Sequence, residues 1–540
     1  MATSADNAKK GQTLYNGIVL PATWPPVQAA VTRNVQPVPY LKNPPAVIPI
    51  DVGRQLFVDD FLVQDTTLAR THHQPEYYAG NPVLKPDRPW EVSKRGPIAM
   101  PFSDLVAYDP AEKIYKMWYL SAAPAGTCYA TSRDGLTWEK PLLDVLPGTN
   151  AVHTTKRDSG SVFLDLEAKD PNERYKMILW AFDAGPENLM TYLSADGIHW
   201  RGPITRLKGT GDRTTAFYNP FRKVWVFSIR AWWPGEMGRG RFYVETPEFT
   251  TPLAGLPQLP WLGADVKDLP YPGYGVTTQL YNHDAAPYES LMIGMFSIWH
   301  GDSSARNPKN PPKMVQDFEA GRPKINVVKI GYSRDGYHWY RPDRRPFMNV
   351  AEKKGDWNWG NVQSIGGGCL IVGDKLYLYF SGRGGKGFPG NNDHDHGCCV
   401  GLAMLRRDGF ASMDAGAAGG ELTTRPVTFK GKHLFVNVDC PGGKLSAEVI
   451  GPDNKPLPGF TLADCTPVTG DTTCRQITWK GGDDLSKFAG QPVRFRFQLA
   501  GGGKLYAFWV SPEKTGASHG YVAAGGPGFT GPTDTVGAVK

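Results

Sequence analysis

The stretch "YSRDGYHW" (332–339) decides the fold, because closely similar stretches recur elsewhere in the chain. They are "TSRDGLTW" (131–138) and "LSADGIHW" (193–200). Asp-Gly is a strong turn signal, and aromatic residues flank it on both sides. We expect the Asp to accept backbone N–H groups, the Gly to adopt a positive φ and the Trp to pack between outer strands. The shared pattern Ser-x-Asp-Gly-x-x-Trp therefore predicts a repeated structural unit, in which these Asp residues serve folding rather than chemistry.

The spacing of the copies gives the size of the unit. Asp134 and Asp196 are 62 residues apart, and Asp196 and Asp335 are 139 residues apart, close to twice a blade-sized interval. We interpret "FYVETPEF" (242–249) as a decayed copy and "LRRDGF" (405–410) as a further remnant. Units of this length are typical of radial repeat folds.

A strand–turn–strand pattern precedes each copy. Each instance pairs two short, aromatic-rich strands across a polar turn, and such a unit buries its faces only against neighbouring units. Five of these units predict an all-β protein with a five-bladed β-propeller of four strands per blade. The five hairpins are 104–121, 161–182, 215–230, 278–299 and 369–383.

The rest of the chain divides by composition. Residues 1–50 are Pro-rich and predict an extended surface arm, and 51–420 would hold the propeller, with "QLFVDDFLV" (55–63) as a strand that closes the ring. Alternating strands over 421–512 predict a C-terminal β-sandwich. The Gly-rich tail, 513–540, predicts disorder.

Charge and cysteine content limit the class of protein. The net charge of +7 is spread along the chain, so we expect a solvated mixed surface and no nucleic-acid partner. No apolar run approaches the length of a membrane span. The seven cysteines form neither a disulfide framework nor a zinc signature, although a single bridge between Cys465 and Cys474 stays open.

With these elements, the chain resembles the five-bladed glycoside hydrolases of the invertase, levanase and arabinanase group (families 32 and 43). The blade mark "SRDGYHW" is similar to theirs and to the sialidase Asp box. "LFVDDFLV", "NPVLKPDRPWE" and "KMWY" look like family-32-like bacterial proteins. The resemblance covers about residues 51–512 and implies a propeller, a sandwich and a glycosidase.

The catalytic motifs of invertases are not intact in this sequence. Invertases carry Asn-Asp-Pro, Arg-Asp-Pro and Glu-Cys motifs. "GDRTTAFYNP" (211–220) is at best a reordered version of the Arg-Asp element, and "YGVTTQ" (274–279) holds no carboxylate where the acid Glu would be sought. The family mechanism therefore does not carry over residue by residue.

Propeller geometry still indicates where the chemistry would lie. The innermost strands of related enzymes begin at one funnel, and the positions just before them here are Ser103-Asp104, Arg157-Asp158, Asp212-Arg213, Tyr274-Gly275 and Gln363-Ser364. Three successive blades thus offer a carboxylate, and glycosidic hydrolysis needs a pair of carboxyl groups across a sugar. Asp104, Asp158 and Asp212 are therefore candidate catalytic residues, with the capping of turns as the alternative role.

The ends of the second strands would reach the same funnel. Glu236, on a Gly-flanked loop, is the leading candidate for general acid and His300 the second, since a His of near-neutral pKa can do this work. A solvated loop carboxylate and a packed His are the alternatives. Trp faces stack on sugars and Arg binds hydroxyl or carboxylate groups. The candidate substrate-binding residues are Arg157, Arg213, Arg230, Trp232, Trp233, Tyr274, Gln363 and Arg383.

"GNNDHDHGCC" (390–399) is the most unusual stretch. Asp393, His394, Asp395 and His396 alternate, so on a strand the acids and the histidines would face opposite sides. Oxygen ligands suit calcium and imidazoles suit zinc. The alternative is a polar loop at the rim of the funnel. We expect no required cofactor, with a structural calcium as the open case.

The leading hypothesis is a glycoside hydrolase that removes a terminal, furanosidic sugar from a poly- or oligosaccharide. One alternative is a sialidase-type hydrolase of an acidic sugar, which the arginines favour. Another is a carbohydrate-binding propeller without catalysis, and a ligand-free scaffold is the third. Such a hydrolase would be secreted or periplasmic, with a signal peptide outside this sequence; "MATSADNAKKGQ" has no apolar core like a signal peptide's, and a cytoplasmic location stays open.

Overall fold

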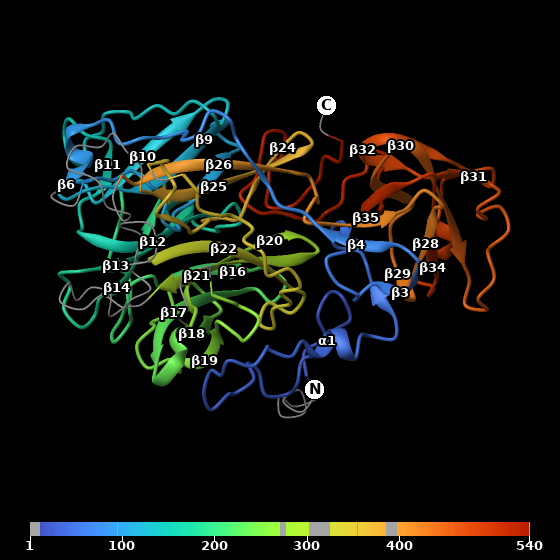
Figure 1. Cartoon of the computed structure of the whole chain (residues 1–540), viewed down its shortest axis with the longest axis horizontal. Helices are drawn as coiled ribbons and strands as arrows, with labels where there is room; N and C mark the ends of the chain where they lie inside the picture. Colours follow the sequence, from blue (N-terminus) through green and yellow to red (C-terminus); the bar gives the residue numbers. More distant parts are fainter. Residues whose placement is uncertain are drawn as a thin grey trace.

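The computed structural model describes residues 11–93, 96–270, 277–301, 324–353, 355–384 and 397–538. The chain forms an all-β molecule, with a propeller of five blades joined to a second β unit (Figure 1). The predicted fold class is confirmed.

The first three blades are antiparallel four-stranded sheets in chain order, each with its first strand nearest the axis. Blade one contains β8 (Val106–Asp109), β9 (Ile114–Leu120), β10 (Thr127–Ser132) and β11 (Ala151–His153). Blade two contains β12 (Arg157–Leu164), β13 (Tyr175–Ala181), β14 (Leu189–Ser194) and β15 (Arg206–Leu207). Blade three contains β16 (Thr215–Asn219), β17 (Val224–Trp233), β18 (Gly238–Thr246) and β19 (Leu259–Gly263).

The last two blades recruit strands from the two ends of the chain. Blade four contains β20 (Gln279–Glu289), β21 (Leu291–Gly301) and β22 (Lys324–Ser333), and β36 (Tyr521–Val522) pairs with its innermost strand. Blade five contains β23 (Asn361–Gln363), β24 (Leu370–Val372), β25 (Lys375–Arg383) and β26 (Cys399–Arg406), with β5 (Glu76–Tyr77) on its outer edge. The short elements η2 (Pro89–Glu91), β6 (Val92–Ser93) and β7 (Gly96–Pro97) connect β5 to blade one.

All five predicted hairpins form the inner pair of strands of a blade. The repeated turn also behaves as its composition predicts. Asp335 accepts N–H bonds from Tyr337 and His338 at 2.9 and 2.8 Å, and Gly336 has a φ of +77°. Asp134 and Asp196 accept equivalent bonds in blades one and two. These Asp residues therefore act as turn caps.

The ring closes in a different place from the one predicted. Tyr77 pairs with Ala403 of β26, so β5 supplies the closing strand of blade five. The stretch 55–63 instead leads into the C-terminal β unit, where β2 (Gln55–Leu56) pairs with Phe508 and Ala507. The prediction that 55–63 closes the ring is wrong, because the apolar residues Leu56, Phe57 and Val58 are buried at the junction of the two units.

The C-terminal β unit draws strands from both sides of the propeller. β30 (His433–Ile450) is its longest strand and pairs with β35 through its first half and with β34 through its second. In Figure 1, β3 and β4 lie beside the orange C-terminal strands. The other strands are β3 (Val63–Thr66), β4 (Ala69–His72), β27 (Ala411–Ala415), β28 (Gly420–Thr424), β31 (Cys465–Thr466), β32 (Val468–Gln476), β33 (Thr478–Trp479), β34 (Arg494–Ala500) and β35 (Gly503–Ser511). The predicted domain boundaries stay predictions.

The Pro-rich N-terminal segment packs against this unit. Its short helix α1 (Pro39–Lys42) buries Tyr40, and β1 (Ile48–Pro49) pairs in parallel with β29 (Val427–Thr428). The remaining short helical turns are η3 (Pro171–Glu173), η4 (Gly235–Met237) and η6 (Ser486–Phe488). Within the described ranges, none of the helices is long and apolar enough to cross a membrane.

The Gly-rich tail is ordered, against prediction, because buried contacts hold it to the propeller. Asp534 is fully buried and binds Arg407 Nη2 at 2.8 Å. Arg407 also lies 3.3 Å from Glu289 of β20, and Arg54 binds Asp408 at 2.9 Å. This buried charge network joins the N-terminal segment, blades four and five, and the tail.

The structure also decides the state of the cysteines. All seven are free, including Cys465 and Cys474. The bridge left open between these two is absent: Cys465 Sγ accepts a hydrogen bond from the N–H of Ala447 instead.

Candidate functional site

A buried polar cluster lies on the propeller axis where the innermost strands begin. Arg213 Nη2 donates to Ser103 Oγ at 3.3 Å and also to Ser364 Oγ. Asn282 Nδ2 donates to the same two hydroxyls at 3.1 and 3.4 Å. These four side chains come from blades one, three, four and five and are buried. The cluster therefore ties the blades together at one end of the axis.

The backbone at this end adopts rare conformations. Phe102, Ser103, Arg213 and Ser364 have φ values of +51°, +75°, +62° and +60°, in the left-handed region that residues other than Gly seldom occupy. Each stands just before or at the end of an innermost strand. Such conformations persist where the surrounding structure fixes them, and they concentrate at functional sites.

Asp104 and Arg157 form a fully buried ion pair between blades one and two. Arg157 Nε also donates to Thr127 Oγ1 at 2.6 Å. Burial raises the pKa of Asp104 to about 6, although Arg157 opposes the shift. A Cβ at Gly160 would lie 2.9 Å from Asp104 Oδ1, so Gly is needed for this close approach. With no exposed surface, Asp104 holds Arg157 in place.

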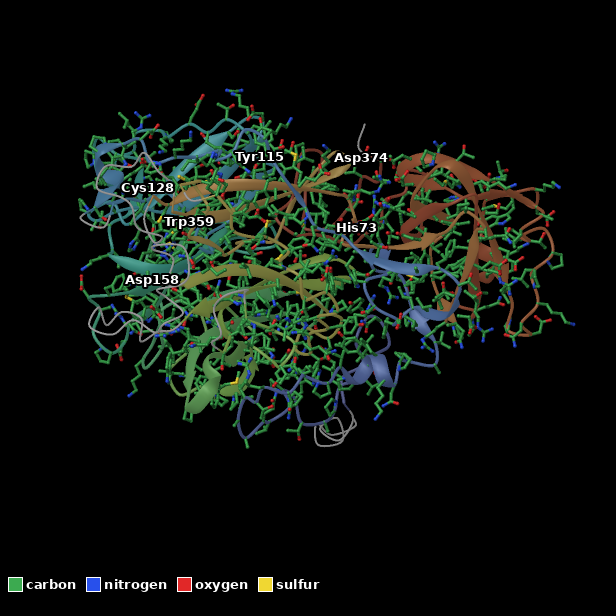
Figure 2. The ribbon with its side chains drawn as sticks, viewed as in Figure 1. His73, Tyr115, Cys128, Asp158, Trp359 and Asp374 are labelled. Carbon is green, nitrogen blue, oxygen red and sulfur yellow. The ribbon has the colours of Figure 1, made fainter. Side chains whose placement is uncertain are left out.

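Asp158 and Asp212 are the two predicted carboxylates with solvent-accessible surface. The side chain of Asp158 is 19% exposed, and its Oδ1 lies 4.0 Å from Arg213 Nη1. The side chain of Asp212 is 35% exposed and binds Arg230 Nε at 2.7 Å. Burial raises the pKa of Asp158; Arg213 opposes this, and the charge of Asp212 adds to it. Figure 2 labels Asp158 where β12 begins.

The two carboxylates thus have different environments. Asp158 is the more buried of the two and its pKa is raised, whereas Asp212 is more exposed and forms an ion pair with Arg230. A Cβ at Gly211 would lie 2.2 Å from Arg230 Nε, so Gly at this position lets the guanidinium reach Asp212. Two carboxyl groups in unlike surroundings are the arrangement from which acid–base chemistry can be built.

An aromatic wall adjoins these carboxylates. Tyr281 and Trp299 lie with ring centroids 5.1 Å apart, and the Arg239 guanidinium stands 4.5 Å from the Trp299 ring and 5.6 Å from Tyr281. Trp232 is 58% exposed and lies 5.4 Å from the same guanidinium. The charges of Asp158 and Asp212 contribute to raising the pKa of Tyr281 to about 12, after burial. Aromatic faces of this kind can stack on a sugar ring.

The substrate-binding candidates of blade five lie on the other side of the axis. With its amide oxygen toward the guanidinium, Gln363 accepts from Arg383 Nε and Nη2, both at 3.1 Å. The guanidinium carbons of Arg383 and Arg213 lie 5.0 and 3.4 Å from the centroid of the Phe102 ring. Phe102 therefore contacts the guanidinium groups of blades three and five.

The remaining predicted residues take less central positions. His300 is buried, and burial lowers its pKa to about 3, so at neutral pH it is a neutral ring and a poor general acid. Trp233 packs on Phe242, with the two ring centroids 5.0 Å apart. Glu236 lies in η4, and its side chain is outside what the structure describes. Tyr274, Asp393, His394, Asp395 and His396 lie outside the described residues.

Sequence reasoning missed several residues of this site. Tyr281, Asn282 and Asp284 lie on β20, and Arg239 and Trp299 lie on β18 and β21. From the sequence we placed the polar position of the fourth blade at Tyr274-Gly275, before a strand expected from 278, whereas the polar residues lie within β20, which has an irregularity between Leu280 and Asn282. An extra residue in a strand shifts the polar position along the chain. The alternation in "YNHDA" (281–285) was the available signal.

No grouping of three or more His, Cys, Asp or Glu that could hold a metal occurs in the part of the chain that the structure describes. Asp158, Asp212 and Asp104 each face an arginine rather than a second carboxylate ligand.

The chain was compared with known proteins and solved structures. No protein-family model matches the chain, and no curated protein matches it. Among solved structures, an N-acetylgalactosamine deacetylase from F. plautii is 12% identical, with 65% of this chain and 96% of that chain covered at a TM-score of 0.40. A glycosyl hydrolase from Bacteroides ovatus is 12% identical over 65% and 96% of the chains at 0.37. A family 43 arabinoxylan arabinofuranohydrolase from Bacillus subtilis is 11% identical over 76% and 79% at 0.28.

Glycoside hydrolases are thus among these solved structures. Likenesses of this size establish neither a family nor an activity for it. The functional conclusion therefore depends on the residues of the site.

Proposed function

We propose that this protein is a glycoside hydrolase that acts at the end of the axis where the innermost strands begin. The observation that supports the proposal is the pair Asp158 and Asp212, which lie on adjacent blades with Arg213 and Arg230 beside them. Glycosidic hydrolysis uses two carboxyl groups, one as the acid and one as the nucleophile or base.

The environments suggest a role for each carboxyl group. Asp158 is the general acid that protonates the leaving oxygen, because burial raises its pKa. Asp212 is the nucleophile or the base, since Arg230 holds its carboxylate at 2.7 Å. Asp104 is a positioning residue that orients Arg157. The exposed Trp232 and the ring of Tyr281 would stack on the sugar.

The finer proposal concerns the substrate. We propose removal of a terminal, furanosidic residue from a poly- or oligosaccharide. The support is the depth of the carboxyl pair: Asp158 is less exposed than Asp212, so a sugar would enter with its end toward the axis.

A sialidase-type reaction has less support. It would need a Tyr nucleophile of lowered pKa beside a Glu, whereas the pKa of Tyr281 is raised to about 12 and its acidic neighbours are Asp158 and Asp212. Arg157 and Arg213 are buried against protein partners, so neither is available to a substrate carboxylate.

The test is release of sugar from a panel of fructans, arabinans, galactans and sialylated glycans, with Asp158→Asn and Asp212→Asn as variants. We expect each variant to lose about 10³-fold or more in kcat/KM, because each removes a group that acts in the transition state. Asp183→Asn is the matched control: its side chain is on blade two and 73% exposed.

The outcomes separate the hypotheses. Sugar release that persists in both variants would exclude Asp158 and Asp212 as the catalytic carboxyl groups. Binding without hydrolysis by the native chain would instead favour the carbohydrate-binding alternative. A loss of activity in a variant counts only if its thermal unfolding matches that of the native chain.

A further inference from the structure

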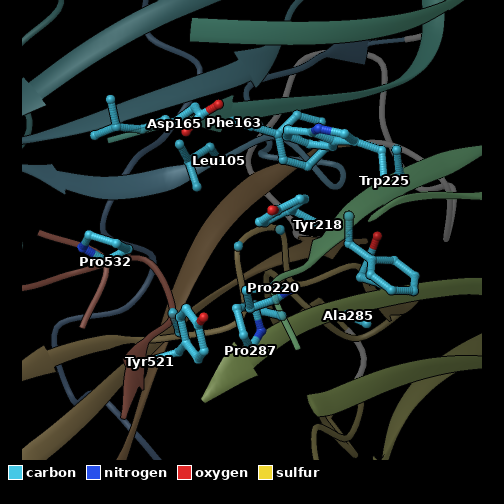
Figure 3. A pocket seen from close by; sticks show the side chains of 18 of the residues that line it. Leu105, Phe163, Asp165, Tyr218, Pro220, Trp225, Ala285, Pro287, Tyr521 and Pro532 are labelled. Carbon is cyan, nitrogen blue, oxygen red and sulfur yellow. The ribbon is translucent and has the colours of Figure 1, made fainter. Parts of the chain in front are cut away.

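A cavity of about 130 Å³ extends along the axis from Ser103 of the polar cluster to the C-terminal tail, and neither Asp158 nor Asp212 lines it. Its walls come from Ser103, from residues of β12, β16 and β20 and from the C-terminal tail (Figure 3). An engineered protein cavity of about 150 Å³ binds benzene, so this space suits one small molecule. The cavity is separate from the carboxyl pair.

The walls are largely aromatic. Trp225 lies with its ring centroid 5.1 Å from those of Phe163 and Tyr218. Tyr521 of the tail lines the same space, as Figure 3 shows. Phe163, Tyr218 and Tyr521 are each only partly buried, so part of each ring is open. The faces of such rings carry negative partial charge.

The charged residues of the lining are all acidic. Asp165, Glu167 and Asp284 line the cavity, and no Lys, Arg or His is among the described lining residues, although the chain has more basic than acidic residues. Asp165 is already bound to Lys176 at 2.7 Å, and Asp284 accepts from Asn282 at 2.8 Å. Two of the three carboxylates therefore have protein partners.

Glu167 differs from these two. It is exposed, and in the described chain no ion pair holds its carboxylate. Its charge lies close enough to the aromatic walls to contribute, after burial, to raising the pKa of Tyr218 and of Tyr521. A carboxylate thus stands beside two open aromatic rings.

We propose that this axial pocket binds a small organic cation of the trimethylammonium type. Aromatic faces and a nearby carboxylate attract such a group, which needs no hydrogen-bond donors from the protein. An anion would meet three carboxylates and no basic residue of the lining. The proposal is independent of the proposed hydrolase, because the cavity shares no carboxylate of the catalytic pair.

The first experiment uses two ligands of one shape. Choline and its neutral counterpart 3,3-dimethylbutan-1-ol are titrated into the full chain and followed by calorimetry and by tryptophan fluorescence. We expect saturable binding of choline and at least tenfold weaker binding of the alcohol. Equal binding of the two, or no binding of choline, would overturn the proposal.

Variants locate the binding. Glu167→Gln should weaken choline binding at least fivefold, and Tyr218→Leu should weaken it as strongly, while Tyr218→Phe should retain it because the ring face remains. The control is Glu187→Gln, an exposed carboxylate on another loop of blade two. Equal effects of Glu167→Gln and Glu187→Gln would exclude this pocket as the site.

Discussion

Asp104, Asp158 and Asp212 occupy corresponding positions in three blades, yet their surroundings give them different chemistry. Asp104 faces a buried guanidinium and has no exposed surface, whereas Asp158 and Asp212 reach the surface to different extents. Correspondence between repeats therefore establishes the position of a carboxyl group, whereas its burial and its charged neighbours depend on the individual blade.

His283 illustrates the cost of a polar residue in a blade core. It is fully buried between Trp261, Phe296 and Trp339, with ring centroids at 5.0, 4.6 and 4.8 Å, and in the described structure neither ring nitrogen has a hydrogen-bond partner. Burial holds its pKa well below the usual range, and Arg241 and Arg341 add to the effect.

We expect His283→Phe to raise the free energy of unfolding by about 1–3 kcal/mol at pH 7, because the unpaired nitrogens are removed. The gain should grow as pH falls from 7 to 5: the native His stays neutral, while the unfolded chain binds a proton below its ordinary pKa of about 6.5. Denaturant unfolding at several pH values measures this, and a gain that is independent of pH would contradict the assignment.

At the scale of the element, the sequence alone predicts the repeated turn and the hairpins of the blades. Alternating aromatic strands and Asp-Gly turns are local signals, and all five hairpins form where those signals lie. The two-residue strand β5 and the tail strand β36 have no such periodicity. They pair only because the completed sheets offer them free edges, and this depends on residues far away in the chain.

In the candidate site, too, local signals predict some residues, and long-range packing determines the others. Asp158 and Asp212 follow from their places next to predicted strands, whereas Asn282 and Tyr281 depend on an irregularity in the pairing of β20. Arg239 and Trp299 come together by the packing of blade three against blade four. A single sequence does not specify such cross-blade contacts.

The caps of the repeated turn should differ in strength. The Asp335 side chain is 3% exposed and that of Asp196 is 45% exposed, although both accept two backbone N–H bonds. We expect Asp335→Ala to cost about 2 kcal/mol of unfolding free energy and Asp196→Ala about 1 kcal/mol or less, because water can replace the cap only in the exposed turn.

Thermal or denaturant unfolding of the two variants gives the comparison. Sugar release by both should stay near the native level, since neither turn contacts the carboxyl pair. A larger loss for Asp196→Ala would show that burial does not set the strength of the cap.

At the scale of the whole molecule, the buried charge network joins the tail to the propeller. Asp534 binds Arg407, which also contacts Glu289, and Asp534 Oδ1 accepts N–H bonds from Val536 and Gly537 at 3.0 and 2.8 Å. Removal of one partner from a buried ion pair leaves the other charge without compensation.

We therefore expect Asp534→Asn to lower the free energy of unfolding by about 3 kcal/mol. The matched control is Asp471→Asn, whose side chain is 59% exposed and pairs with the neighbouring Arg406 at 2.5 Å. An exposed pair contributes about 1 kcal/mol or less. Chemical denaturation of both variants measures the difference, and equal losses would mean that the buried network does not anchor the tail.

The pairing of β5 with β26, of β2 with β35 and of β36 with β20 has a consequence for biosynthesis. During translation, Tyr77 is made long before its partner Ala403, and Leu56 long before Ala507. Blade four gains its last strand only when Tyr521 has left the ribosome. The early strands must therefore remain unpaired until their distant partners have been made, and during that time their exposed edges can pair with other chains and aggregate.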